Sequence, residues 1–98
     1  MTRIARAIQE ACDEVKRDVW IDPWNVTAED LNNGLCAEVM DAIVKRIPEA
    51  EKCDSDFAAH FFVRYRGRYY DAEAPNGVDH PNQLPIFRRS FAGQRKNG

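Results

Sequence analysis

The sequence predicts a small α+β domain in which two main helices pack on a small antiparallel sheet that contains a β-hairpin. Two segments in the first half, residues 3–19 and 34–47, repeat apolar side chains at helical spacing. Residues 59–75 instead alternate like two strands joined at Arg66-Gly67. Helices followed by strands are typical of the α+β class. The 98 residues suit one domain, which we expect over residues 1–90, with a disordered basic tail at 91–98.

The first helix is expected over residues 3–19, because its apolar side chains would form one buried stripe. Thr2 is well placed to cap its first turn. The stripe consists of Ile4, Ile8, Ala11, Cys12, Val15 and Val19.

The second helix is expected to start at Gly34 or Leu35 and to end near Ile47, before Pro48. The letters TAED at residues 27–30 form the aspartate variant of a capping box and predict a short helical turn. The polar segment PEAEKCDSD, residues 48–56, is expected to be a loop. The wide apolar face of the second helix consists of Leu35, Cys36, Val39, Met40, Ile43, Val44 and Ile47.

The segment AHFFVRYRGRYYDAEAP, residues 59–75, is expected to fold as the hairpin. Side chains alternate across a strand, so both strands should present two faces, and aromatic residues on each indicate that both are covered. Leu84, Ile86 and Phe87 are expected to pack back onto the domain. One face carries Phe61, Val63, Tyr70 and Ala72, and the other carries His60, Phe62, Arg64, Tyr69, Asp71 and Glu73.

Composition and charge argue against several classes of function. No apolar run approaches the roughly 18 residues of a membrane span, and the first residues do not read as a signal peptide, so we expect a cytoplasmic protein with no membrane partner. Three irregularly spaced cysteines favour free thiols and no metal or cofactor site. The net charge is −2, although residues 88–98 hold four bases and no acid. The acidic body of the domain argues against nucleic-acid binding.

Cys36 stands out among the three cysteines because it is expected in the first turn of the second helix. Unpaired N–H groups and a partial positive charge at a helix start favour a thiolate, the reactive form of cysteine. Cys12 is expected in the middle of a helix and Cys53 in a charged loop, without that advantage.

His60, Asp71 and Glu73 are expected on one face of the hairpin. With the turn at Arg66-Gly67, Asp71 lies opposite Phe62 and Glu73 opposite His60, so both acids come close to the imidazole. A thiolate nucleophile needs a base such as histidine, and an acid can hold the histidine in the right tautomer. The sequence therefore predicts a Cys36–His60–Asp71 triad.

The letters NGLCAEVM around Cys36 and HFFVRYRGRYYDAE around His60 and Asp71 resemble the papain-like cysteine protease superfamily, and its transglutaminase-like branch in particular. The resemblance covers about residues 32–78 and rests on a cysteine at a helix start, a histidine that opens a strand and an aspartate on the next strand. It implies an abbreviated, single-domain papain-like fold.

The resemblance also implies a cysteine-dependent amide hydrolase or acyltransferase that acts on a peptide, amide or acyl substrate. Cys36 would attack the carbonyl, His60 would act as general base and then general acid, and Asp71 would orient His60. The oxyanion hole would use the backbone N–H of Cys36, with Asn32 or Asn33 as a possible second donor. Glu73 is the alternative acid.

Three other interpretations stay open. Cys36 and His60 are each, taken alone, typical of an inert core thiol and a satisfied core histidine. The same fold could serve as an inactive papain-like module for binding or assembly. A metal site built from Cys36, His60 and an acid is a further alternative.

Overall fold

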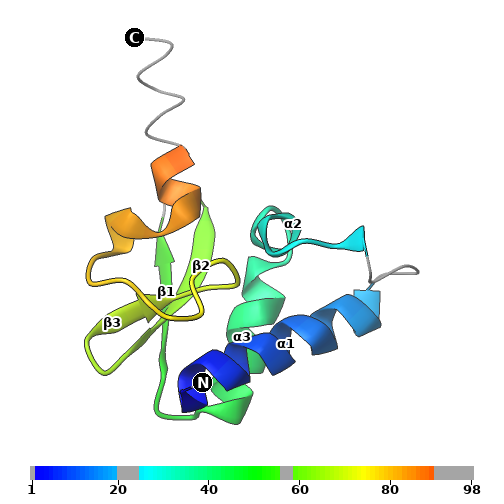
Figure 1. The fold of residues 1–98 in the computed structure, drawn as a ribbon, viewed down its shortest axis with the longest axis horizontal. Coiled ribbons are helices and arrows are strands. Elements are labelled where there is room, and N and C mark those ends of the chain that lie inside the picture. Colours follow the sequence, from blue (N-terminus) through cyan, green and yellow to red (C-terminus); the bar gives the residue numbers. More distant parts are fainter. Residues whose placement is uncertain (1, 20–24, 56–58, 90–98) are drawn as a thin grey trace, which may run out of the picture.

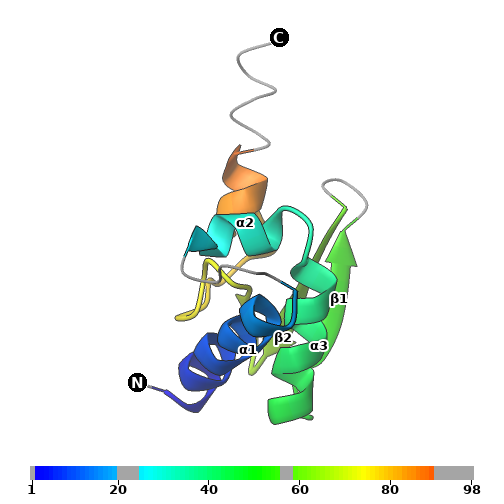
Figure 2. The same ribbon diagram turned by 90° about the vertical axis from the view of Figure 1, so that its right-hand side faces the viewer.

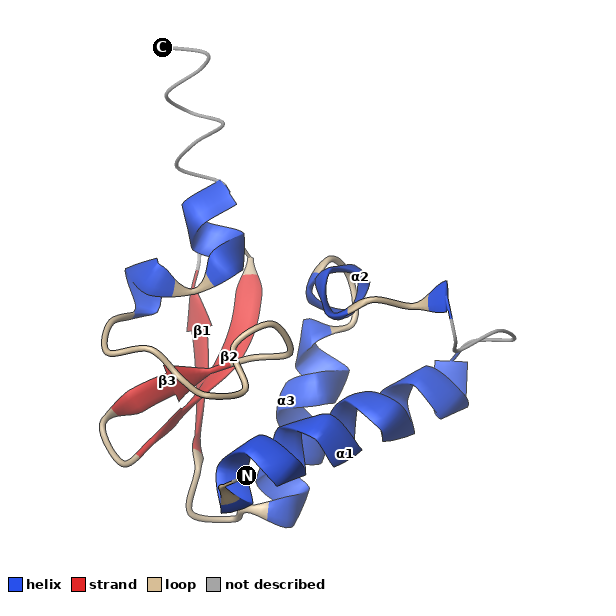
Figure 3. Ribbon diagram, in the orientation of Figure 1, coloured by secondary structure: helices blue, strands red, loops and turns tan. Residues whose placement is uncertain are grey.

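The computed structural model describes residues 2–19, 25–55 and 59–89 and shows an α+β fold (Figures 1 and 3). Its elements, in chain order, are α1 (Arg3–Val19), α2 (Ala28–Asn32), α3 (Cys36–Arg46), β1 (Glu51–Ser55), β2 (His60–Tyr65), β3 (Arg68–Tyr70) and the 3₁₀ helix η2 (Pro81–Gln83). A helical turn follows at 85–89. The tail expected at 91–98 lies outside the described residues.

The helices α1 and α2 begin where their capping residues predict. Thr2 Oγ1 accepts a hydrogen bond from the Ala5 N–H at 3.1 Å, which confirms the predicted start of α1. Thr27 and Asp30 form the predicted capping box of α2. The helix expected from residue 34 or 35 begins at Cys36 and ends at Arg46, so Cys36 is its first residue.

The sheet is antiparallel, with the strand order β1-β2-β3. The hairpin between β2 and β3 turns at Arg66 and Gly67, whose φ angles of 51° and 77° are both positive, as expected for a tight two-residue hairpin turn. The prediction of a loop over residues 48–56 is wrong, because residues 51–55 form β1 and pair with β2. This edge strand keeps polar, largely exposed side chains, and main-chain pairing with β2 specifies it.

The helices α1 and α3 lie on one face of the sheet, and the segment 78–89 lies on the other (Figures 1 and 2). We call the first the helix face: Val63, Tyr65 and Tyr70 pack there with α3, and α1 packs on α3. We call the second the histidine face: Phe62 packs there with Leu84 and Phe87. Leu84 and Phe87 are buried and Ile86 is partly buried, which confirms that this segment packs back.

Among the described residues, no helix is both long enough and apolar enough to cross a membrane.

Candidate functional site

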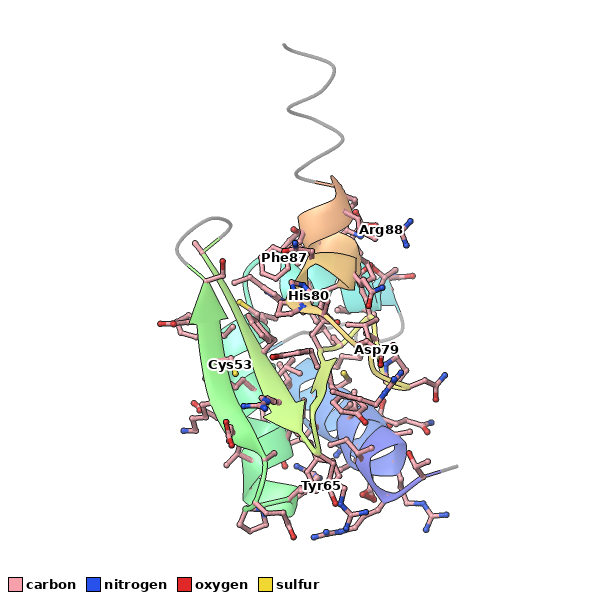
Figure 4. All side chains as sticks on the ribbon, turned by 90° about the vertical axis from the view of Figure 1, so that its left-hand side faces the viewer. Cys53, Tyr65, Asp79, His80, Phe87 and Arg88 are labelled. Carbon is pink, nitrogen blue, oxygen red and sulfur yellow. The ribbon has the colours of Figure 1, made fainter. Side chains whose placement is uncertain are left out.

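His60 opens β2 on the histidine face and is 1% exposed. Its ring stacks on Phe62 with a centroid distance of 5.9 Å and meets the Phe87 ring edge-on at 5.6 Å. Figure 4 shows Phe87 on the side of the C-terminal turn that faces the strands, whereas Arg88 points away from them. The imidazole is thus enclosed by aromatic rings from two segments far apart in sequence.

Asp71 follows β3 directly and pairs with His60. Its Oδ2 lies 2.9 Å from His60 Nε2, and both side chains are almost fully buried. Its other oxygen, Oδ1, accepts a hydrogen bond from the Glu73 N–H at 2.9 Å. Each carboxylate oxygen therefore has one fixed partner. The short tertiary separation follows from the hairpin, because the register Val63–Tyr70 brings the chain after Tyr70 beside the start of β2.

The pairing has a consequence for the other imidazole nitrogen. A neutral histidine carries one proton, and donation of Nε2–H to a carboxylate leaves Nδ1 with a free lone pair. Among the described residues, the buried Nδ1 of His60 has no hydrogen-bond partner. Since buried polar atoms are almost always paired, this orphaned acceptor is an unusual feature of the molecule. In the tautomer that carries its proton on Nε2, Nδ1 is a hydrogen-bond acceptor with no donor beside it among the described residues.

Glu73 extends the pair into a larger network. Its carboxylate accepts two hydrogen bonds from Arg89, at 2.7 and 2.8 Å, and one from Asn32 Nδ2 at 2.8 Å. The Arg89 hydrogen bonds lower the pKa of Glu73; burial opposes them, and Asn32 lowers the pKa further. We call Asn32, His60, Asp71, Glu73 and Arg89 the His60 network. Glu73 supports Asp71 through its backbone N–H, and Asp71 is the acid that bonds to the imidazole.

Asn32 and Asn33 have different places in the structure. Asn32 is 3% exposed, its Nδ2 is engaged by Glu73, and its Oδ1 has no partner among the described residues. Asn33 is exposed and is the C-cap of α2, where its backbone N–H bonds back to Asp30 and Glu29. The structure therefore brings Asn32 into the His60 network and leaves Asn33 to shape the turn before α3.

Cys36 is the first residue of α3 and is partly buried as a free thiol. The N-cap residue Leu35 provides no side-chain cap, so the first-turn N–H groups of α3 lack the oxygen partner that threonines supply to α1 and α2. Within the described parts of the chain, Cys36 makes no hydrogen bond to His60. The structure thus brings His60, Asp71, Glu73 and Asn32 together, but places no thiol on Nδ1.

The other two thiols have environments that disfavour a thiolate. Burial raises the pKa of Cys12 to about 11. Burial also raises the pKa of Cys53, whose Sγ lies 3.8 Å from the Glu51 carbonyl oxygen. Neither cysteine offers a reactive alternative to Cys36.

Arg89 is the network member that sequence reasoning missed. It belongs to the basic run 88–98, which resembles a solvated tail when read as sequence. Only the fold brings it to Glu73, 16 residues earlier in the chain. Within residues 2–19, 25–55 and 59–89, no three His, Cys, Asp or Glu side chains are grouped to hold a metal ion.

Comparisons of the chain with protein-family models, with curated proteins and with solved structures found no match.

Proposed function

We propose that this protein is a cysteine-dependent amide hydrolase or acyltransferase of the papain-like, transglutaminase-like type. Cys36 is the nucleophile, His60 the general base and acid, and Asp71 the residue that orients His60. One observation carries the proposal: the buried His60 ring is bonded through Nε2 to Asp71, while its buried Nδ1 has no partner among the described residues. This is the state in which a base receives a thiol proton.

The start of α3 supports the assignment of Cys36. A thiolate at the first residue of a helix interacts favourably with the partial positive charge there. The N-cap residue Leu35 makes no side-chain hydrogen bond to the first turn, and the proposal assigns the backbone N–H of Cys36 to the oxyanion. Asn32 Nδ2 is already bonded to Glu73, which assigns Asn32 to support of the acid rather than to the oxyanion hole.

The proposed reaction needs only Cys36, His60, the substrate and a water or second amine. The Cys36 thiol transfers its proton to His60 Nδ1, and the thiolate attacks the substrate carbonyl carbon. The C–N bond of the tetrahedral intermediate breaks while His60 returns the proton to the leaving amine. A water or a second amine then attacks the thioester, with His60 again as base, and releases Cys36. The first step requires Cys36 Sγ to come within hydrogen-bond distance of Nδ1, a contact that is not made among the described residues.

The complete burial of the His60 side chain favours a second candidate function. In it, the papain-like fold is a binding or assembly module, and the His60–Asp71 pair only holds the segment 71–89 on the sheet. This alternative predicts an ordinary Cys36 thiol and full biological function in Cys36→Ala.

Alkylation of the native protein by iodoacetamide, followed cysteine by cysteine with mass spectrometry between pH 5 and 9, separates the two candidates. The proposed function predicts that Cys36 reacts fastest and already reacts well below pH 7, with Cys53 next and Cys12 slowest. Cys53 and Cys12 serve as internal references in the same sample. His60→Gln should abolish the advantage of Cys36, provided that circular dichroism shows a folded variant. A Cys36 that reacts no faster than Cys53 would eliminate the enzyme.

A further inference from the structure

Arg89 lies on the helical turn 85–89 and reaches back to two earlier segments of the chain. Its guanidinium makes a two-pronged contact with the Glu73 carboxylate, at 2.7 and 2.8 Å. Its Nε lies 3.6 Å from the carboxylate of Glu29 on α2, beside which the turn lies in Figure 2. A paired fork of this kind is the strongest and most directional hydrogen-bond arrangement between arginine and a carboxylate.

The contact is connected to His60 through main-chain and side-chain hydrogen bonds. The backbone N–H of Glu73, the residue whose side chain Arg89 holds, donates to Asp71 Oδ1 at 2.9 Å. Asp71 Oδ2 in turn meets His60 Nε2 at 2.9 Å. Arg89 thus fixes the position of the N–H group that fixes the acid of the triad.

The same turn also contacts the imidazole directly, because Phe87 meets the His60 ring edge-on at 5.6 Å. An anchored Arg89 therefore holds both the cover over His60 and the turn that carries Asp71. Loss of this anchor should loosen the two together.

An ordinary surface ion pair offers a contrast. Arg3 and Glu49 also form a two-pronged contact, at 3.2 Å for each prong, but their side chains are 57% and 55% exposed. In the Arg89–Glu73 pair, Arg89 is 40% exposed, but the Glu73 side chain is only 15% exposed and shares its carboxylate with Asn32. Exposed pairs contribute little to structure, whereas a partly buried, shared carboxylate determines the geometry around it.

We propose that Arg89 is a positioning residue: through Glu73 it holds Asp71 in the orientation that keeps the His60 proton on Nε2 and leaves Nδ1 free. Its effect on Cys36 reactivity rests on the proposed function, but its effect on the His60 tautomer does not. Removal of the guanidinium should let the turn 71–74 move, so that the carboxylate no longer selects one tautomer.

The test measures both effects on the full chain with ¹⁵N-labelled histidine. Two-dimensional NMR of the ring nitrogens reports which nitrogen carries the proton, and a His60→Gln spectrum assigns the signals. Cys36 alkylation is measured on the same samples. Arg88→Gln is the matched control, since it makes the same charge change one residue away on a side chain that points away from the strands (Figure 4).

We expect the wild type and Arg88→Gln to show one tautomer, with the proton on Nε2, at pH 8. Arg89→Gln should show a mixture of both tautomers and roughly 10-fold slower Cys36 alkylation, the size of effect typical of outer residues that orient a functional histidine. Arg89→Lys keeps the positive charge but loses the two-pronged contact with Glu73. Its tautomer ratio and its rate of Cys36 alkylation should lie between those of the wild type and Arg89→Gln. Should Arg89→Gln unfold, Arg89→Lys and Glu73→Gln test the same link.

The outcomes separate this inference from the proposed function. If Arg89→Gln matches Arg88→Gln in both measurements, the positioning role is overturned, even where Cys36 is highly reactive. If the tautomer changes but wild-type Cys36 reacts like a plain thiol, the positioning role stands and the proposed enzyme function fails.

Discussion

The two faces of the sheet are built from the same strand but by different interactions. On the helix face, Val63 and Tyr65 of β2 pack into an apolar core with α1 and α3. On the histidine face, the alternate residues His60 and Phe62 pack under a short C-terminal segment that carries part of the His60 network. Strand alternation thus separates a face that serves stability from one that holds a candidate reactive group.

The difference matters because the two faces respond differently to the loss of one residue. An apolar core that loses a methyl group loses transfer and packing energy in proportion. A buried polar pair that loses one member leaves the other without a partner in an apolar surrounding, which costs more than the pair itself contributes. Single and paired substitutions should therefore reveal which kind of interaction each face depends on.

The largest expected effect comes from breaking the His60–Asp71 pair. Asp71→Leu leaves two donors, the His60 Nε2–H and the Glu73 N–H, without an acceptor and should lower the free energy of unfolding by about 3 kcal/mol. Val63→Ala, on the helix face, should cost about 2 kcal/mol. Urea unfolding followed by circular dichroism measures both.

The double variant His60→Phe/Asp71→Leu sharpens the same comparison. It replaces both polar partners with apolar side chains and should recover more than half of the stability lost in Asp71→Leu, because no buried polar group of the pair is left unpaired. Cys36 should nevertheless react like an ordinary thiol in it. Equal stability of the single and double variants would contradict this account of the histidine face.

A smaller effect is expected at Gly77, where the C-terminal segment meets the helix-face residue Tyr70. Gly77 has φ +80°, and a Cβ there would lie 2.6 Å from Tyr70 Cε2. Gly77→Ala should therefore cost about 2 kcal/mol, from backbone strain and the displaced ring together. Gly67→Ala is the matched control: its φ is +77° and no atom lies within 4 Å, so it should cost only about 1 kcal/mol. Equal thermal shifts for both variants would show that the contact with Tyr70 does not matter.

The smallest effect is a pH dependence at Glu73. Its pKa is lower in the folded protein than in the unfolded chain, so its carboxylate form stabilises the fold. This contribution is fully present above the unfolded pKa of about 4.3 and is lost as the pH falls through the lower folded pKa. Glu73→Gln should therefore reduce the loss of stability between pH 6 and 3, measured by urea unfolding at each pH. If Glu73→Gln lost more stability than the wild type between pH 6 and 3, the Glu73 carboxylate would not stabilise the fold as stated.

Local sequence signals predicted much of the fold. Thr2 and the capping box at Thr27 marked two helix starts, and Arg66-Gly67 marked the hairpin turn. The same turn implied that the chain after Tyr70 returns beside His60, and the structure places Asp71 there. Each of these features depends on residues within a few positions of one another, or on a register that one turn determines.

Sequence reasoning missed β1 because a polar edge strand shows no apolar alternation, and its hydrogen bonds to β2 are main-chain contacts that side-chain patterns do not report. It also missed Arg89, since a basic side chain near the end of a chain looks the same whether it is solvated or bound to Glu73.

The sequence by itself therefore determined the helices, the hairpin and the face on which His60 and Asp71 lie, because these follow from local periodicity and turn geometry. Only the tertiary structure decided that Asn32, Glu73 and Arg89 join them and that Phe87 covers the imidazole. It also decided that, among the described residues, Cys36 makes no hydrogen bond to His60. The physical reason is that these contacts join segments far apart in the chain, and their positions depend on how the whole core packs.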